Sequence, residues 1–348
     1  MAVRFLQGFF GSPCLASGGA LLGDIYSIFN LLFAMMAWVA AVCGGPSLGP
    51  LLAGFLVTAK SWRWSLWETF WASILAFIMM FLLLPETSTP NILLRRAQRV
   101  RKLTGDSRLF SESELKQKSL STSRIVTDAP IKPLEITIKD PAVLFVQVYT
   151  GIIYGIYYSF FESFSMVYPV MYGMSLGEST LVFLSILMSC IIGISIYFTV
   201  LVSQATKIKK EGLPVQERRL IPALFASFGP VAGLFIFGWT ARESIHWIVP
   251  TVGVTIFNTA AFILMQSILI YVPFSYLMHA ASLIAANDLF RSGTAFAAIL
   301  FAPPTYKNMG IAKGTSLLGG LTVIGIIGIF ILYLHGAKLR AKSRLALS

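Results

Sequence analysis

The stretch Cys43-Gly44-Gly45-Pro46-Ser47-Leu48-Gly49-Pro50 lies inside an apolar run that extends over residues 33–57. Glycine and proline weaken helices, and proline also removes a backbone hydrogen-bond donor. In a membrane, such residues are tolerated where neighbouring helices or a cavity satisfy the freed backbone groups. A transporter core uses a helix of this kind, whereas a simple anchor has no need of one. The stretch therefore indicates a movable helix within a membrane-embedded bundle.

The composition of the whole chain agrees with a membrane protein. Of its 348 residues, 56% are apolar and only 12% are charged, and its mean hydropathy is +0.76. The charged share is about half that of a soluble domain, so lipid must surround most of the chain. The net charge of +12 does not indicate a nucleic-acid partner, because the basic residues lie in loops between apolar runs.

Apolar segments of membrane length recur along the sequence. A window of about 20 residues predicts about nine spans, and hence an all-α integral membrane protein. A signal peptide is the alternative for the first span, but the glycines and the proline inside it argue against that interpretation. The predicted spans cover residues 3–23, 33–57, 67–84, 142–165, 179–203, 220–239, 246–272, 287–306 and 313–334.

The distribution of basic residues predicts the orientation. Eleven Lys and Arg residues lie in 86–140, five in 204–219 and four after 334, whereas the connections on the opposite side hold five in total. The positive-inside rule places the basic set in the cytoplasm. Nine crossings then put the N-terminus outside and the C-terminus inside. We expect the plasma membrane, with the vacuolar membrane as the alternative.

Residues 86–140 separate the first three predicted spans from the last six. This segment is polar and rich in serine and basic residues, which is typical of a cytoplasmic linker that is partly disordered. Leu109 to Leu120 is a candidate for a short amphipathic helix within it.

Three local patterns carry a resemblance to a known family. They are Arg4-Phe5-Leu6-Gln7-Gly8 with Gly11-Ser12, the Gly-Pro-rich stretch with Gly54, and the segment from Tyr154 to Phe164. With these patterns the chain resembles the major facilitator superfamily, and more narrowly the fungal drug:proton antiporters of the twelve-span type. That group exports drugs, azoles, benomyl and polyamines.

The first pattern resembles the Arg-x-x-Gln-Gly motif of the family's fourth helix. The resemblance implies that Arg4 faces a central cavity and takes part in proton coupling. An arginine within a span costs about 2.5–3.5 kcal/mol on insertion scales, so it usually has a partner or a wet cavity. The alternative is that Arg4 lies near the end of its span and reaches the interface.

The second pattern resembles the antiporter signature of the family's fifth helix. Gly45, Gly49 and Gly54 recur near helical spacing, which allows a partner helix to approach closely. Pro46 and Pro50 favour a bend. The resemblance implies that these five residues carry conformational work in an exporter that exchanges substrate for protons, whereas mere helix packing is the alternative.

The third pattern looks like the family's seventh helix. Glu162 is the only acidic residue well within a predicted span, which makes it a candidate proton-binding group; contact with headgroups at the outer end is the alternative. Aromatic rings suit a cavity for bulky, apolar or cationic molecules, although some of them will face lipid. The cavity candidates are Tyr154, Tyr157, Tyr158 and Phe161.

A weaker similarity is found in Ala285 to Ser292, which resembles a segment before the family's eleventh helix. Asp288 and Arg291 are three residues apart, so they can pair on one helix face. We interpret them as a gating pair at the cytoplasmic mouth of the transporter, and we do not expect them to contact the substrate directly.

The resemblance runs from the family's fourth helix to its twelfth and assigns domains accordingly. Residues 1–85 correspond to an incomplete N-terminal half with helices four to six, 86–140 to a cytoplasmic linker, 141–334 to a six-helix half, and 335–348 to a basic tail. The family's first three helices have no counterpart, so we expect an N-terminally truncated form that does not transport by itself.

The resemblance implies proton-coupled efflux of toxic or drug-like molecules by alternating access. The alternatives are a non-transporting remnant that acts as a regulator or receptor, and a facilitator for nutrient uptake. No enzyme motif, metal-ligand spacing or nucleotide loop occurs in the sequence, so we expect no cofactor and a proton gradient as the energy source. The expected partners are the lipid bilayer and a drug, toxin, polyamine or secondary metabolite, and we expect a monomer.

Overall fold

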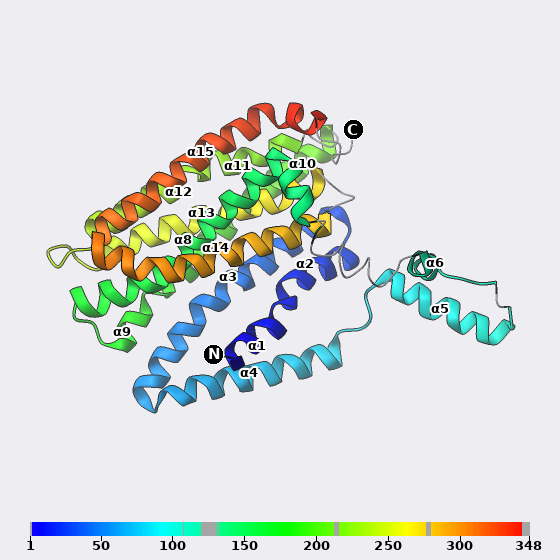
Figure 1. Cartoon of the computed structure of the whole chain (residues 1–348), viewed down its shortest axis with the longest axis horizontal. Coiled ribbons are helices and arrows are strands. Elements are labelled where there is room, and N and C mark those ends of the chain that lie inside the picture. Colours follow the sequence, from blue (N-terminus) through cyan, green and yellow to red (C-terminus); the bar gives the residue numbers. More distant parts are fainter. Residues whose placement is uncertain are drawn as a thin grey trace. The chain divides into compact units, whose positions relative to one another are not determined.

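The computed structural model describes residues 2–106, 108–119, 131, 133–211, 216–275 and 280–342 (Figure 1). The regular structure among these residues is helical throughout. The helices form two compact units. The first comprises Met1–Met35 and Leu66–Glu135, and the second comprises Met36–Ser65 and Ile136–Ser348.

The first predicted span is divided into two helices, α1 (Ala2–Gly11) and α2 (Pro13–Ile25). Pro13 occupies the first turn of α2, where its missing N–H would have no intrahelical partner in any case. Helices of 10 and 13 residues are too short to cross a bilayer one at a time. The other eight predicted spans each correspond to a helical segment of membrane length, and the described residues contain eight such segments.

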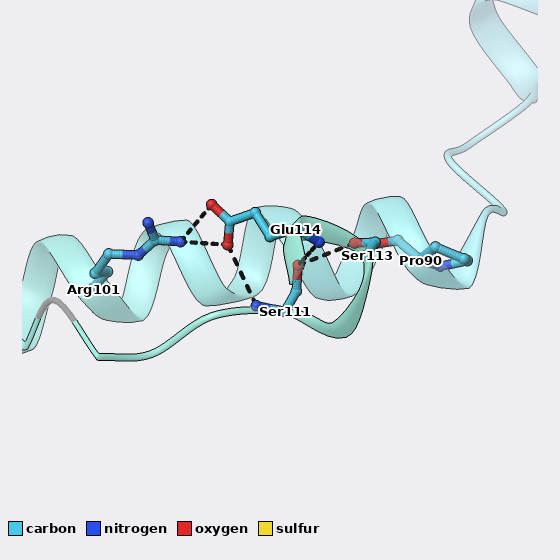
Figure 2. Close-up of polar contacts among 5 residues, drawn as sticks. All are labelled: Pro90, Arg101, Ser111, Ser113 and Glu114. Atoms are coloured by element: carbon cyan, nitrogen blue, oxygen red, sulfur yellow. Dashed lines mark hydrogen bonds and ion pairs between the residues drawn. The ribbon is translucent and has the colours of Figure 1, made fainter. Parts of the chain in front are cut away.

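The polar segment after α4 (Trp62–Leu83) contains two further helices, α5 (Thr89–Thr104) and α6 (Glu112–Ser119). An Nη atom of Arg101 on α5 donates to both carboxylate oxygens of Glu114 on α6, at 2.9 and 2.7 Å (Figure 2). This two-pronged, charge-assisted contact fixes α6 against α5. Helix α6 lies within the amphipathic helix that the sequence predicts for this segment.

The second unit contains most of α3 (Ile28–Ala59) and all the remaining helices. These are α8 (Pro141–Met166), the π-helical turn η1 (Val167–Met171), α9 (Leu176–Leu181), α10 (Leu184–Glu211), the 3-10 turn η2 (Gln216–Leu220), α11 (Ile221–Ala226), α12 (Phe228–Thr240), α13 (Ile248–Ser275), α14 (Ala280–Met309) and α15 (Ile311–Lys342).

Small residues allow the helices of this unit to pack closely. Helix α8 packs on α14, and α13 packs on both α10 and α12. A Cβ atom at Gly155 of α8 would lie 3.2 Å from the carbonyl oxygen of Thr294 on α14, and one at Gly233 of α12 would lie 2.7 Å from the backbone nitrogen of Phe257 on α13. Glycine at these positions therefore sets the distance between the helices.

Aromatic rings fill the centre of the second unit. The ring of Phe160 on α8 meets Phe237 on α12 and Phe257 on α13 edge-on, with centroids 5.2 and 5.1 Å apart. All three side chains are buried. Edge-to-face pairs of this kind are each worth about 0.5–1.5 kcal/mol beyond the burial of their area, so they hold α8 in the middle of the unit.

Helix α3 continues through the Gly-Pro-rich stretch without interruption. The buried Ser47 hydroxyl donates to the carbonyl oxygen of Gly44 at 2.7 Å. This bond satisfies the hydroxyl of Ser47 within its own helix. At Gly54 the helix lies directly against Thr180 of α9, because a methyl group there would overlap the threonine side chain.

Candidate functional site

A cavity of about 70 Å³ lies within the second unit, between α3, α8, α10, α13 and α14. Its wall is mostly apolar. Helix α3 contributes Trp38, Val39, Val42, Cys43 and Pro46; α8 contributes Ile153, Tyr154 and Tyr157; and the other three helices contribute Ile186, Cys190, Asn258, Ala261, Phe262, Met265, Leu269 and Arg291. A wall of rings and apolar groups with few polar atoms is typical of a site for small organic molecules.

The Gly-Pro-rich stretch forms one side of this cavity through Pro46 and Cys43. Among the described residues of the second unit, a Cβ atom at Gly45 or Gly49 would meet no heavy atom of another helix within 4 Å. These two glycines differ in this respect from Gly54, which is tightly packed. The predicted motif therefore combines one tight interhelical contact with two positions that have no such contact among the described residues.

The four predicted aromatic residues form one cluster on α8. Tyr154 and Tyr158 have ring centroids 5.0 Å apart, and Tyr157 and Phe161 have centroids 5.5 Å apart. Of these four, Tyr154 and Tyr157 line the cavity. Tyr158 and Phe161 support them from behind, and Phe161 contacts Phe183 with a centroid distance of 5.1 Å.

The predicted gating pair lies on α14. An Nη atom of Arg291 is 3.6 Å from a carboxylate oxygen of Asp288. The Arg291 guanidinium also stacks over the ring of Tyr154 at 4.5 Å from its centroid, which is within the range of a cation–π contact. Arg291 also lines the cavity, whereas Asp288 is not among the described wall residues.

Arg4 belongs to the first unit, and Glu162 is not among the described residues that line the cavity of the second unit. Arg4 is exposed on α1 in the first unit, where its guanidinium donates to the side-chain oxygen of Gln7 at 3.2 Å. Glu162 is half-buried on α8, one turn after Tyr158. The structure thus brings Pro46, the tyrosines and Arg291 together around one space.

Two cysteines meet in the cavity wall, and sequence reasoning did not anticipate this. Cys43 of α3 and Cys190 of α10 both line the cavity, and their thiols lie near one another. Asn258 and Phe262 of α13 are further wall residues that the sequence did not single out. Asn258 offered a signal, because a buried amide within an apolar span usually serves packing or function.

Most of the chain matches one family of known proteins. The model of the Major Facilitator Superfamily matches residues 1–299. The chain belongs to the major facilitator superfamily. It is accordingly an integral, multi-pass membrane protein of a transporter family.

Curated relatives are named as fungal transporters and resistance proteins. The chain is 43% identical over 347 residues to MFS-type transporter pyvG of Aspergillus violaceofuscus, covering 99% of this chain and 64% of that protein. It is 37% identical over 356 residues to the cycloheximide resistance protein of Candida maltosa, with 99% and 64% covered. Identity to fluconazole resistance protein 1 of Saccharomyces cerevisiae is 34% over 348 residues, with 99% and 63% covered. The chain thus spans just under two thirds of the length of these relatives.

Proposed function

We propose that this major facilitator chain belongs to a proton-coupled exporter of small drug-like molecules, and that the cavity of the second unit holds the exported molecule. Two relatives named for resistance to cycloheximide and to fluconazole support this class of substrate. The exporter works by alternating access, in which packed helices move around a binding site within the membrane.

One observation carries the proposal. The helix with the Gly-Pro-rich motif shares a cavity wall with the aromatic face of α8. A molecule bound to Tyr154 and Tyr157 therefore contacts Pro46. Substrate binding can thus shift α3, the helix that we propose moves during transport. This shared wall supports a role for the motif in the movement that follows substrate binding.

The size of the cavity fits a constricted state of such a site. Pockets for drug-sized ligands hold about 300–1,000 Å³, whereas this cavity holds about 70 Å³. Binding therefore requires the wall to open. The open space beside Gly45 and Gly49 gives α3 freedom to shift, while the contact of Gly54 with Thr180 provides a fixed point.

We assign charge coupling to two residues that the sequence motifs single out. Glu162 lies within the span formed by Pro141–Met171, where a carboxyl group that gains and loses a proton can couple to the tyrosines one turn away. Arg4 is the second coupling residue, and Asp288 with Arg291 forms the gate. The exporter takes its energy from the proton gradient and acts in the plasma membrane as a monomer.

Binding of named compounds tests the proposal at the cavity. The purified 348-residue chain in lipid nanodiscs should bind fluconazole or cycloheximide in equilibrium dialysis. Tyr157→Ala should weaken binding about 2- to 12-fold, because an aromatic contact is worth about 0.5–1.5 kcal/mol. Tyr158→Ala is the matched control, since Tyr158 belongs to the same cluster but not to the wall. The proposal is wrong if neither compound binds, or if Tyr157→Ala binds as tightly as the unchanged chain.

Proton release tests the coupling. In an antiporter the substrate displaces a bound proton, so ligand binding in weakly buffered solution should acidify a pH indicator. Glu162→Gln should abolish this release while ligand binding persists. Glu178→Gln is the control, because Glu178 caps α9 through Ser175 and plays no part in the proposed coupling. Unchanged release by Glu162→Gln would contradict the assignment.

A further inference from the structure

Arg291 is the one charged residue among the described residues that line the cavity. Its side chain is nine-tenths buried, with 10% of its surface exposed. The other wall residues carry apolar, aromatic, thiol or amide side chains, and none of them is acidic. Within the described residues, the charge that a ligand in this cavity meets is therefore positive.

One buried donor of Arg291 is available to a ligand. A guanidinium has five N–H donors, and the buried Nε of Arg291 has no hydrogen-bond partner among the described residues. In the ion pair with Asp288, the distance from Nη to the carboxylate oxygen is 3.6 Å. This is longer than the distance of about 2.7–2.9 Å in a charge-assisted hydrogen bond. Buried donors without acceptors cost free energy, so an acceptor on a bound ligand would remove this cost.

The surroundings of Arg291 favour a flat ligand beside the charge. The ring of Tyr154 lies under the guanidinium at 4.5 Å, and the ring of Tyr157 is stacked near it with a centroid distance of 6.0 Å. A planar apolar group would therefore rest on aromatic and aliphatic wall residues, while its polar substituent would face the guanidinium. A carboxylate matches the planar fork of an arginine with two parallel hydrogen bonds.

We propose that the cavity selects aromatic molecules that carry a carboxylate, and that Arg291 is the residue that binds this group. The inference rests on the proposed function, because it names the substrate class of the same cavity. It favours organic acids over the polyamines and cationic drugs that the sequence leaves open. A cation would meet the guanidinium with like charge and would find no carboxylate among the described wall residues.

Three probes of nearly equal shape test the charge preference. The probes are 2-naphthoate, 2-naphthamide and 2-naphthylmethylammonium, which are anionic, neutral and cationic at neutral pH. Dialysis against the purified 348-residue chain should give at least about tenfold tighter binding for the naphthoate than for the ammonium compound, which corresponds to the loss of one good charged contact.

Variants at position 291 test whether Arg291 causes the preference for the anionic probe. Arg291→Gln should weaken naphthoate binding about tenfold or more and leave naphthamide binding within about twofold of the unchanged chain. Arg291→Lys should retain part of the preference, because it keeps the charge but loses the fork. Asp288→Asn should leave naphthoate binding equal or tighter, since it removes the competing carboxylate. Thermal unfolding of each variant checks that the fold is kept.

The outcomes separate this inference from the proposed function. Equal binding of the three probes, or tighter binding of the ammonium compound, would overturn the charge preference. The proposal that the cavity binds drug-like molecules would still stand. Unchanged naphthoate binding by a folded Arg291→Gln variant would overturn the role of Arg291. Failure of all three probes to bind would overturn the inference, whereas the proposed function would stand if fluconazole or cycloheximide still bound to the cavity.

Discussion

At the residue scale, the cavity unites side chains that are distant in the sequence. Cys43, Tyr157 and Arg291 come from three different helices and line one space. The sequence identified Tyr157 through the density of aromatic residues and Arg291 through a local pair. It could not show that either faces Cys43, because a helix that is apolar on all sides gives no periodic signal for its inward face.

The pair of cavity cysteines gives a prediction at this scale. The thiols of Cys43 and Cys190 lie near one another in the cavity wall, so an oxidant such as diamide, which accepts two electrons and two protons, should join them in a disulfide. In a Cys14→Ser background these two are the remaining cysteines. Labelling of the denatured monomer with polyethylene-glycol maleimide should then show no free thiol until a reductant is added.

Cys43→Ser in the same background is the control for this cross-link. Its single thiol should remain available for labelling in the monomer after diamide treatment. Persistence of two free thiols in the parent chain, or cross-linking between molecules alone, would contradict the contact between α3 and α10.

At the scale of helices, most spans were predictable because hydropathy determines what can enter lipid. The eighth span was predicted as 287–306, whereas α14 extends over Ala280–Met309. The prediction was short because Asp288 and Arg291 lower the hydropathy at its start and Pro303-Pro304 marks a break near its end. In the structure the two charges pair, and the helix continues past both prolines to Gly310, whose φ of 79° ends it.

Spacing alone could not assign roles within the Gly-Pro motif. The sequence treats Gly45, Gly49 and Gly54 alike as sites of close packing. The structure separates them, because only Gly54 of the three would place a methyl group against another helix. Such contacts depend on which helix lies opposite, and this information is not contained in the motif.

Substitution of these glycines gives a prediction for α3. Gly54→Ala should destabilise the protein by about 1–3 kcal/mol, because an added methyl group in a packed contact forces side chains or backbone to shift. The midpoint of thermal unfolding in detergent should fall accordingly. Gly45→Ala, which meets no neighbour among the described residues, is the matched control and should leave the midpoint unchanged or slightly higher, because alanine favours a helix more than glycine does.

A second substitution tests whether the contact with Thr180 causes the loss of stability in Gly54→Ala. Thr180→Ala removes the hydroxyl and methyl groups that Gly54→Ala would meet, so the double variant should recover part of the lost stability. Equal midpoints for Gly54→Ala and Gly45→Ala would show that α3 does not pack on α9 at this point.

At the scale of the whole molecule, composition indicated a membrane protein, and three short motifs indicated its family. Both conclusions hold, since the major facilitator model matches residues 1–299 and eight segments are long and apolar enough to span a membrane. Orientation stays a prediction from the basic loops. The assignment of domains at 1–85, 86–140, 141–334 and 335–348 also stays a prediction.

The orientation can be tested with introduced cysteines. In a cysteine-free background, Lys338→Cys should be protected from a membrane-impermeant maleimide added to intact cells, because the positive-inside rule places this residue in the cytoplasm. Lys60→Cys should be labelled, since it lies in a connection on the opposite side. Labelling of Lys338→Cys in intact cells, with Lys60→Cys protected, would invert the topology.

Photolabelling of the cavity tests the central claim, that the second unit holds the site for drug-like molecules. A diazirine derivative of fluconazole is activated on the 348-residue chain in membranes, and the labelled peptides are identified by mass spectrometry. The account predicts label on peptides that contain Tyr154, Tyr157 and Phe262, removed by excess fluconazole. Label that fluconazole displaces from α4 or α5, with none on the cavity peptides, would contradict it.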